Sequence, residues 1–371
     1  MSGTVLRLSA EQVFAWRLRR QFLVEPAASA VEVVRRLAGV QAQVASAAEL
    51  AVALRSAEPA ADAVASALGA RKVLRTWAMR GTLHVLTAEQ AAAALALVAS
   101  ARTWEKPVWT RTFGATPEQI TALGAALTEI LADAALSRAE LVAAVAARPG
   151  LAHLDEQLRS GWGAVLKPLA WQGILCHGPA QGSRVTFTSP ARAVTGWPGL
   201  PEPDAAAATL IPAYLGAYGP ATPEAFDAWL SRNSLRKTVL RRWFAELGTA
   251  LTPVEVDGRG CFARTEDLDE LAAARPVREV LLLGGFDQYV LGPGTTDTAL
   301  VPAAHRAAVS RPGGWISPVL VRDGRVTGTW ERDGDDIVVT PFEKAPTAKQ
   351  LAAAAARLAT ATGATLRARI G

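Results

Sequence analysis

The chain has 371 residues, half of them hydrophobic, and a formal net charge of +5. A chain of this length is too long to fold around one ordinary hydrophobic core, so about two to four compact units are expected. No uninterrupted apolar stretch approaches the roughly 18 residues that span a bilayer, so an integral membrane protein of helical type is excluded. Of the 39 basic residues 33 are Arg, which suits bidentate phosphate contacts but also follows from a GC-rich genome. Clusters at 71–80 and 232–242 favour a nucleic-acid partner.

The first part of the chain has the pattern of several helices followed by two strands. Ser9 and Ser29 are suited to cap helices, and Gly39 is suited to end one. Residues 73–86 are rich in β-branched and aromatic residues around a central Arg-Gly, which predicts a strand pair. Helices are expected at 13–23, 29–39, 47–54 and 62–68. This order is that of a winged helix, which we expect over residues 1–95.

The same order of elements recurs in the second part of the chain. Ser137 and Glu140 have the spacing of a capping box at a helix start. A second helix is expected at 160–172, followed by strands at 174–177 and 184–188. We therefore expect a second winged helix over 96–197.

A third helix–helix–strand–strand order follows a proline-containing linker at 198–203. Its first helix is expected to begin at Thr222. Its second helix is expected to span 235–247 and is basic. Asp257-Gly258 between strands at 251–256 and 260–264 is a good hairpin signal. We expect a third winged helix over 198–275.

The last part of the chain, 276–371, has the pattern of a β domain. Its predicted strands are short and are separated by turns such as Asp323-Gly324. A closing helix is expected at 347–360. Strands are expected at 280–283, 289–291, 316–321, 325–330, 337–341 and 365–370. The predicted fold class is α+β, with three tandem winged helices followed by a β-barrel-like domain.

Cysteine and histidine usage predicts a cytoplasmic protein without a metal or cofactor. Cys176 and Cys261 lack metal-ligand spacing and fit a reducing compartment. The four histidines are scattered, and only His84 lies near the candidate site discussed next. The N-terminus carries Arg7 and leads into a capped helix, so it is unlike a signal peptide.

The best candidate for a reaction centre is the pair Gln41 and Gln43 beside Gly39. The chain has no phosphate-binding Gly-Lys-Ser loop, no Gly-x-Ser-x-Gly elbow and no dense His/Cys cluster. At a helix start or in an extended turn, side chains at i and i+2 can face one cleft. The common alternative is that two glutamines at a helix boundary are a solvated end or a local cap.

Four blocks of the sequence resemble the AlkZ-like bacterial DNA glycosylases, a family of winged-helix DNA-binding proteins. The blocks keep the order of that family and lie at 37–43, 75–84, 286–292 and 323–330. The resemblance covers nearly the whole chain and implies three winged helices and a C-terminal β domain. The family's catalytic Gln-x-Gln pair corresponds to Gln41 and Gln43. A related subgroup has Asp at the second position, so Gln43 places this chain nearer the members that unhook crosslinks and adducts.

The resemblance implies a monofunctional, metal-independent glycosylase of base excision repair that acts on bulky N7-alkylguanine. Alkylation at N7 makes the base a cationic leaving group that needs no protonation. Two neutral amides can fix a water at C1′ through donor and acceptor together. The motif has no Lys for Schiff-base chemistry, which argues against strand cleavage. The resemblance further implies self-resistance to a DNA-alkylating antibiotic.

The expected partner is double-stranded DNA carrying an alkylated purine, bound by a monomer, with no membrane partner. The basic clusters supply the candidate contacts, although a charged face is often merely solvated. The candidates are Arg75, Arg80, Thr82 and His84 in the first wing, Ser234, Arg236, Lys237 and Arg241 in the third unit, and Arg322 and Arg325 at a hairpin tip. Two alternatives stay open: a non-catalytic winged-helix transcription regulator, which would normally be a two-fold dimer, and an inactive binder of damaged DNA.

Overall fold

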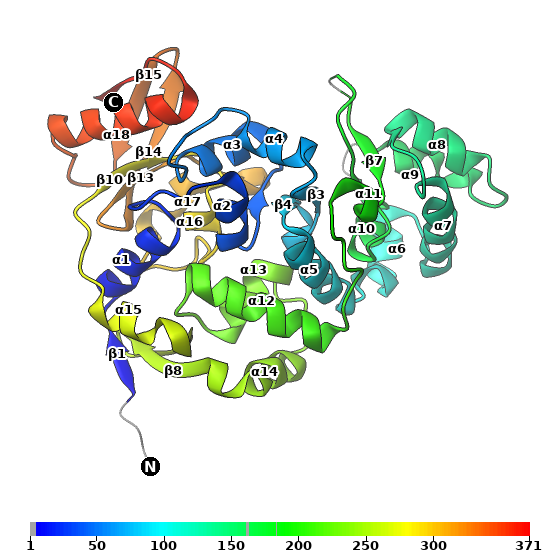
Figure 1. The fold of residues 1–371 in the computed structure, drawn as a ribbon, viewed down its shortest axis with the longest axis horizontal. Helices are drawn as coiled ribbons and strands as arrows, with labels where there is room; N and C mark the ends of the chain where they lie inside the picture. The colour runs from blue at the N-terminus through cyan, green and yellow to red at the C-terminus, as the bar shows by residue number, and fades with distance from the viewer. Residues whose placement is uncertain (1–4, 161–162, 183) are drawn as a thin grey trace. The chain divides into compact units, whose positions relative to one another are not determined.

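The computed structural model describes residues 5–160, 163–182 and 184–371. It divides into two compact units with a mixed α+β composition, which confirms the α+β part of the predicted fold class (Figure 1). Unit 1 comprises the chain up to Ala65, Ile211–Trp229 and Phe244–Gly371, and unit 2 comprises Ser66–Leu210 and Leu230–Trp243. No helix among the described residues is long and apolar enough to cross a membrane.

The N-terminal helices of unit 1 begin where the sequence places their caps. Ser9 forms a capping box with Gln12 ahead of α1 (Ala10–Arg20), and the Ser29 side chain caps α2 (Ala30–Arg36). The four helices predicted between residues 13 and 68 are confirmed, apart from small shifts at their ends. The other elements here are β1 (Leu6–Leu8), β2 (Val40–Gln41), α3 (Ala45–Ala53) and α4 (Ala63–Gly69).

A three-stranded sheet in unit 1 contains the predicted Asp-Gly hairpin. Strands β8 (Leu251–Val256) and β9 (Arg259–Arg264) pair antiparallel, and β1 pairs parallel to β8. Asp257 and Gly258 both have positive φ, 44° and 81°, as a tight turn of type I′ requires. The helices before and after this sheet are α12 (Pro203–Tyr218), α13 (Pro223–Ser231), α14 (Lys237–Glu246) and α15 (Leu268–Ala273).

The C-terminal part of unit 1 is a curled, half-barrel sheet whose open side is covered by a helix. The strand order is β10-β13-β14-β15-β16, and only β15 and β16 pair parallel. Helix α18 (Ala348–Thr362), red in Figure 1, contacts both edge strands. The strands are β10 (Val280–Leu283), β13 (Val319–Arg322), β14 (Arg325–Asp333), β15 (Asp336–Pro341) and β16 (Arg367–Ile370). A separate small hairpin pairs β11 (Ser310–Arg311) with β12 (Trp315–Ile316), just after α17 (Arg306–Val309).

Of the strands predicted in this region, the one at 289–291 is wrong and the one at 316–321 is wrong in part. Residues 289–291 belong to a helical turn, α16 (Gln288–Leu291), because the Asp287 carboxylate accepts a hydrogen bond from the Tyr289 amide and caps it. The predicted strand at 316–321 is interrupted between β12 and β13, where Pro318 offers no amide N–H to a strand ladder.

Unit 2 is built on one sheet that joins the two predicted strand pairs. Strands β3 (Leu74–Trp77) and β4 (Leu83–Leu86) pair antiparallel as predicted, and so do β6 (Cys176–His177) and β7 (Thr186–Thr188). Because β3 also pairs with β6, through Arg75 and His177, the order within this unit is β4-β3-β6-β7-β5. Strand β5 is Leu136–Ser137.

The helix predicted at 160–172 is wrong for most of its length. Residues 161–162 lie outside the described chain, and the helical residues are Lys167–Trp171, in α10. Gly163 has φ +60°, and Pro168 lies in the first turn of α10, where the missing proline N–H costs nothing. The other helices of unit 2 are α5 (Ala88–Ser100), α6 (Pro107–Phe113), α7 (Pro117–Ile130), α8 (Arg138–Ala146), α9 (Asp155–Arg159) and α11 (Pro190–Ala193).

Candidate active site and DNA-contact residues

The two candidate catalytic glutamines lie where a buried strand gives way to a helix start. Gln41 ends β2 and is 6% exposed, whereas Gln43 is exposed and lies in the bend before α3. Val44, at the N-cap of α3, supplies no side-chain cap. The pair therefore combines an amide embedded in the protein with an amide that solvent reaches.

The turn before Gln41 is fixed by the way α2 ends. The Ala38 amide donates to Arg35 O and the Gly39 amide donates to Val34 O, which is the pattern of a Schellman motif. Ala38 and Gly39 take positive φ of 48° and 104°. The Tyr218 hydroxyl donates to the carbonyl of Leu37 at 2.6 Å, inside the protein. These contacts set the direction in which the chain enters β2.

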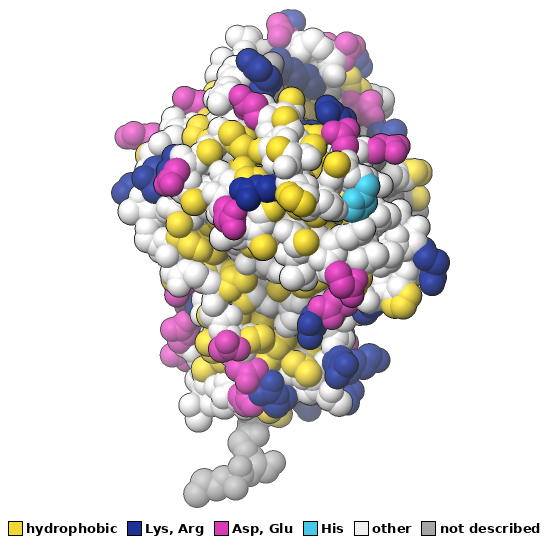
Figure 2. Space-filling model, turned by 90° about the vertical axis from the view of Figure 1, so that its right-hand side faces the viewer, with side chains coloured by type: hydrophobic (Ala, Val, Ile, Leu, Met, Phe, Trp, Pro, Cys, Tyr) yellow, Lys and Arg dark blue, Asp and Glu magenta, His cyan; other side chains and the backbone are white. Residues whose placement is uncertain are grey.

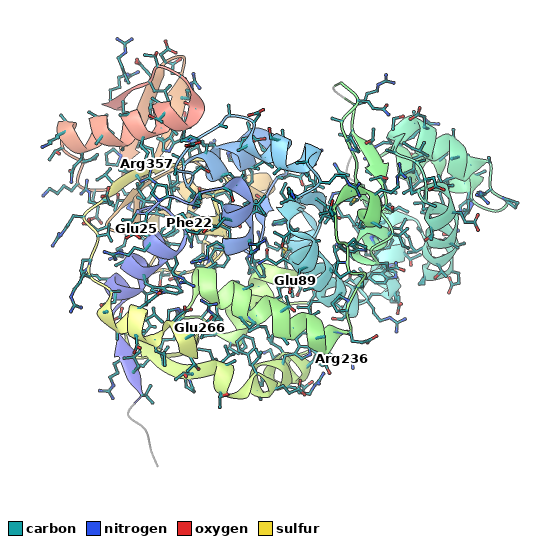
Figure 3. All side chains as sticks on the ribbon, viewed as in Figure 1. Phe22, Glu25, Glu89, Arg236, Glu266 and Arg357 are labelled. Atoms are coloured by element: carbon teal, nitrogen blue, oxygen red, sulfur yellow. The ribbon has the colours of Figure 1, made fainter. Side chains whose placement is uncertain are left out.

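The far end of α3 is held by one buried and one half-buried arginine. Arg55 makes a two-point ion pair with Asp287, at 2.9 and 2.7 Å, and neither side chain is exposed. Arg357 on α18, labelled in Figure 3, donates to the carbonyls of Leu54 and Leu23 at 2.8 and 2.7 Å. Sequence reasoning left the role of Asp287 open and missed Arg55 and Arg357, whose partners are far away in the chain.

The residues predicted for DNA contact in the first strand pair differ in accessibility. Arg75 is half-buried, and its Nη2 lies 3.0 Å from His177 Nδ1. The Thr82 hydroxyl donates to Met79 O at 3.1 Å. His84 is fully buried, with Nδ1 3.0 Å from Thr82 O. Arg80 adopts a positive φ of 56° between the strands and lines a cavity in unit 2. His84 thus packs beneath the hairpin, and Arg80 is half-buried at its turn.

Acidification is expected to weaken unit 2 because it buries two neutral histidines. Burial lowers the pKa of His84 to about 3, with a smaller contribution from the positive charge of Arg80. Burial also lowers the pKa of His177 to about 3, with smaller contributions from Arg75 and Arg138. An unfolded chain protonates histidine near pH 6.5, so between these values the unfolded state binds more protons. The contribution of the two histidines to the free energy of unfolding is fully present above about pH 6.5. Below this pH it falls by up to about 1.4 kcal/mol per pH unit for each histidine.

The measurement is the melting temperature between pH 6.5 and 5, for the wild type and for His84→Gln. The variant is expected to lose less stability over this interval than the wild type does. His153→Gln, at an exposed histidine of the same unit, serves as the control and is expected to keep the wild-type slope. If the melting temperature of His84→Gln fell with pH as steeply as that of the wild type, the buried neutral His84 would not be a source of the pH dependence.

The predicted residues around α14 are exposed or half-buried in unit 2. Arg236, labelled in Figure 3, Lys237 and Arg241 are exposed, and Ser234 is half-buried. Arg236 and Ser234 line a groove of about 540 Å³ that also takes in Arg102 and Lys106. Sequence reasoning missed the last two because they precede α6 and lie outside both arginine clusters.

The two candidate arginines of the C-terminal hairpin are held differently. Arg322 donates to Lys344 O at 2.8 Å, whereas Arg325 is exposed. Between them Gly324, with φ +84°, packs against Phe14 so closely that a Cβ would collide with it. The β13–β14 turn therefore packs closely against α1.

Charge on the face shown in Figure 2 is mixed. Basic and acidic side chains alternate across it, with hydrophobic side chains between them. This face carries no field of one sign.

Comparisons with known proteins agree over nearly the whole chain. Residues 34–361 match the family described as DNA glycosylase AlkZ-like. A curated interstrand DNA cross-link repair glycosylase of Streptomyces sahachiroi is 52% identical over 365 residues, which are 96% of this chain and 98% of that protein. The solved structure of Streptomyces sahachiroi DNA glycosylase AlkZ has 51% identity and a TM-score of 0.96, covering 99% of this chain and 100% of that one. The family resemblance read from the four blocks is confirmed: the chain belongs to the AlkZ-like DNA glycosylases.

Proposed function

We propose that this DNA glycosylase hydrolyses the N-glycosidic bond of bulky N7-alkylguanine in duplex DNA, including guanine held in an interstrand crosslink. The observation that carries the proposal is the Gln41/Gln43 pair at the start of α3, with one amide buried and the other exposed. A relative that shares 52% of its sequence is named an interstrand DNA cross-link repair glycosylase, which supports this substrate class.

The proposed chemistry uses neutral amides because the substrate is already activated. A base alkylated at N7 leaves as a neutral molecule when the C1′–N9 bond breaks, so no general acid has to protonate it. The amide oxygens accept hydrogen bonds from a water and the amide nitrogens donate to it, which fixes the water on the face of C1′ opposite to the base. The proton of this water passes to solvent. We propose a monofunctional reaction that uses no metal and leaves an abasic site.

The proposed DNA contacts are exposed and half-buried basic residues of the candidate set, together with Ser234. In unit 2 they are Arg80, Ser234, Arg236, Lys237 and Arg241, and in unit 1 they are Arg325 with Arg322 behind it. Arg75, Thr82 and His84 support the β3–β4 hairpin from their observed contacts. We propose that three winged helices present these residues, and that a cytoplasmic monomer protects its producer from a DNA-alkylating antibiotic.

The test is base release from a duplex that carries one bulky N7-alkylguanine. After incubation with the protein, hot alkali converts each abasic site to a strand break, and the expected result is a break at the alkylated position alone. The same duplex without the adduct is the matched control. Tight binding to one DNA sequence without release of any base would favour a transcription regulator instead, and binding of the adduct without release would favour an inactive damage binder.

A further inference from the structure

Unit 1 contains a cavity at the end of α1 whose lining is rich in arginine. Its volume is about 570 Å³, within the range of about 300–1,000 Å³ that is usual for small-molecule sites. Its walls come from α1 and the loop after it, from α2, and from α15 and the segment that follows it. The charged residues of the lining are Arg19, Arg20, Arg36, Arg275, Glu25 and Glu270.

Only Arg20 among these four arginines has a carboxylate partner. Its guanidinium lies 3.3 Å from Glu270 and 3.4 Å from Asp267. Among the described residues, the other three arginines have no carboxylate within the 4.0 Å of an ion pair. Glu25, which is exposed and labelled in Figure 3, pairs with none of them. The lining therefore carries positive charge that the protein itself does not neutralise.

The three arginines without a carboxylate keep hydrogen-bond donors available. Arg19 donates through Nη1 to Ala15 O at 3.4 Å and to Arg275 O at 3.2 Å. Arg36 donates through Nη1 to Arg20 O at 3.4 Å. In the described part of the chain, Nε and Nη2 of both have no acceptor, and neither has the exposed side chain of Arg275. A guanidinium group binds phosphate through two such parallel N–H groups.

Two aromatic rings hold the inner guanidinium groups in place. The guanidinium carbon of Arg36 lies 5.1 Å from the ring centroid of Phe22, and that of Arg20 lies 5.5 Å from Trp16. Phe22, labelled in Figure 3, has φ 60° just after α1, where a glycine is usual. Trp16 is only 3% exposed. The rings therefore support cations and offer little surface on which a ligand could stack.

The cations in this cavity repel one another. Burial lowers the pKa of Arg36, and the charges of Arg20 and Arg264 lower it further, while Asp267 and Glu32 have smaller, opposite effects. Arginine nevertheless stays protonated in proteins. An anion among these side chains would reduce the repulsion, and its attraction would exceed that in bulk water because the site is half-buried.

We propose that this cavity binds two adjacent phosphate groups through Arg19, Arg36 and Arg275. Phosphate oxygens match the paired N–H groups of arginine, and the cavity has room for two linked phosphates. Such a pair occurs along one strand of DNA and also in a free diphosphate ligand, and the experiment below distinguishes these two sources. The inference takes nothing from base hydrolysis at Gln41 and Gln43.

The first measurement is calorimetric titration with inorganic pyrophosphate at low ionic strength. Arg36→Gln and Arg275→Gln are each expected to weaken its binding about tenfold, which is the loss of a hydrogen bond between charged groups. Arg278→Gln is the matched control, because Arg278 is also exposed, lies three residues after Arg275 and does not line the cavity. It is expected to keep the wild-type affinity. Since Arg275 is exposed, its variant tests the site without disturbing the packing around Arg36.

The second measurement is the salt dependence of binding to an unmodified DNA duplex, followed by fluorescence anisotropy. If the phosphates belong to DNA, Arg36→Gln and Arg275→Gln each reduce the slope of log affinity against log salt by about one, and Arg278→Gln does not. If they belong to a free ligand, pyrophosphate binding weakens in the two cavity variants while their slopes stay at the wild-type value.

The proposal is overturned if pyrophosphate fails to bind, or binds equally to all four proteins, and the salt slopes are also equal. The alkali assay on the same preparations separates this outcome from the proposed function. A wild type that binds as expected but releases no base contradicts the glycosylase proposal alone. Normal base release with neither binding effect contradicts the cavity proposal alone.

Discussion

Replacing Gln43 by Ala is expected to slow base release from an N7-alkylated duplex by about 100-fold while leaving the affinity for that duplex within about twofold. The expected loss is that of one preorganised hydrogen-bonding group at a reacting centre, which is commonly 100-fold or more. Gln43 is exposed at the start of α3, so its truncation leaves no cavity. The measurement is the single-turnover rate of alkali-sensitive break formation with enzyme in excess, which reports chemistry and not product release.

Gln41→Ala is expected to lose at least as much rate, but it also removes a buried side chain, so its melting temperature has to be measured beside its rate. Gln43→Glu keeps an acceptor for water and is expected to retain more activity than Gln43→Ala. Ser46→Ala is the matched control, because it changes an exposed polar residue in the first turn of α3. Wild-type rates in both Gln41→Ala and Gln43→Ala would remove the pair from the mechanism.

Elements with a local chemical cause were predictable from the sequence. The serines at 9, 29 and 137 each cap a helix as expected, since a cap depends on residues within one turn. The Asp257-Gly258 hairpin was predictable for the same reason, because the turn needs two residues at positive φ. Residues 289–291 were misassigned as a strand because three apolar residues fit either periodicity, and the deciding cap comes from Asp287.

The framework of the candidate site was not predictable from the same signals. The pairing of β3 with β6 joins Arg75 to His177, about 100 positions later, and no local pattern encodes such a register. The contacts at the end of α3 join residues still farther apart in the chain, since Arg55 reaches Asp287 and Leu54 is bound by Arg357. Gln41 and Gln43 were found through the family resemblance, because two amides carry no chemical signature of their own.

Breaking the buried pair of Arg55 and Asp287 is expected to cause the largest loss of stability. In Arg55→Met the Asp287 carboxylate stays fully buried without its cation, and such losses are about 3–5 kcal/mol. With about 2–4 °C per kcal/mol for a chain portion of this size, the melting temperature is expected to fall by about 10 °C. Asp287 also caps the Tyr289 amide, so Asp287→Asn, which keeps an acceptor oxygen, is expected to lose less than Asp287→Ala.

The double variant Arg55→Met/Asp287→Leu separates the charge from the packing. Since it leaves no unpaired ion, it is expected to be more stable than Arg55→Met alone, as hydrophobic replacements of buried ion pairs commonly are. Arg311→Met, which breaks an exposed pair with Glu331 in the same unit, is expected to change stability by less than about 1 kcal/mol.

Because Arg55 anchors the helix that begins beside Gln43, a loosened α3 is also expected to lower the rate of base release in the folded fraction of Arg55→Met. A displacement of about 1 Å at a reacting group can cost about 100-fold. An unchanged melting temperature in Arg55→Met would contradict the structural role of the pair, and a full rate at a lowered melting temperature would show that α3 keeps Gln43 in place without it.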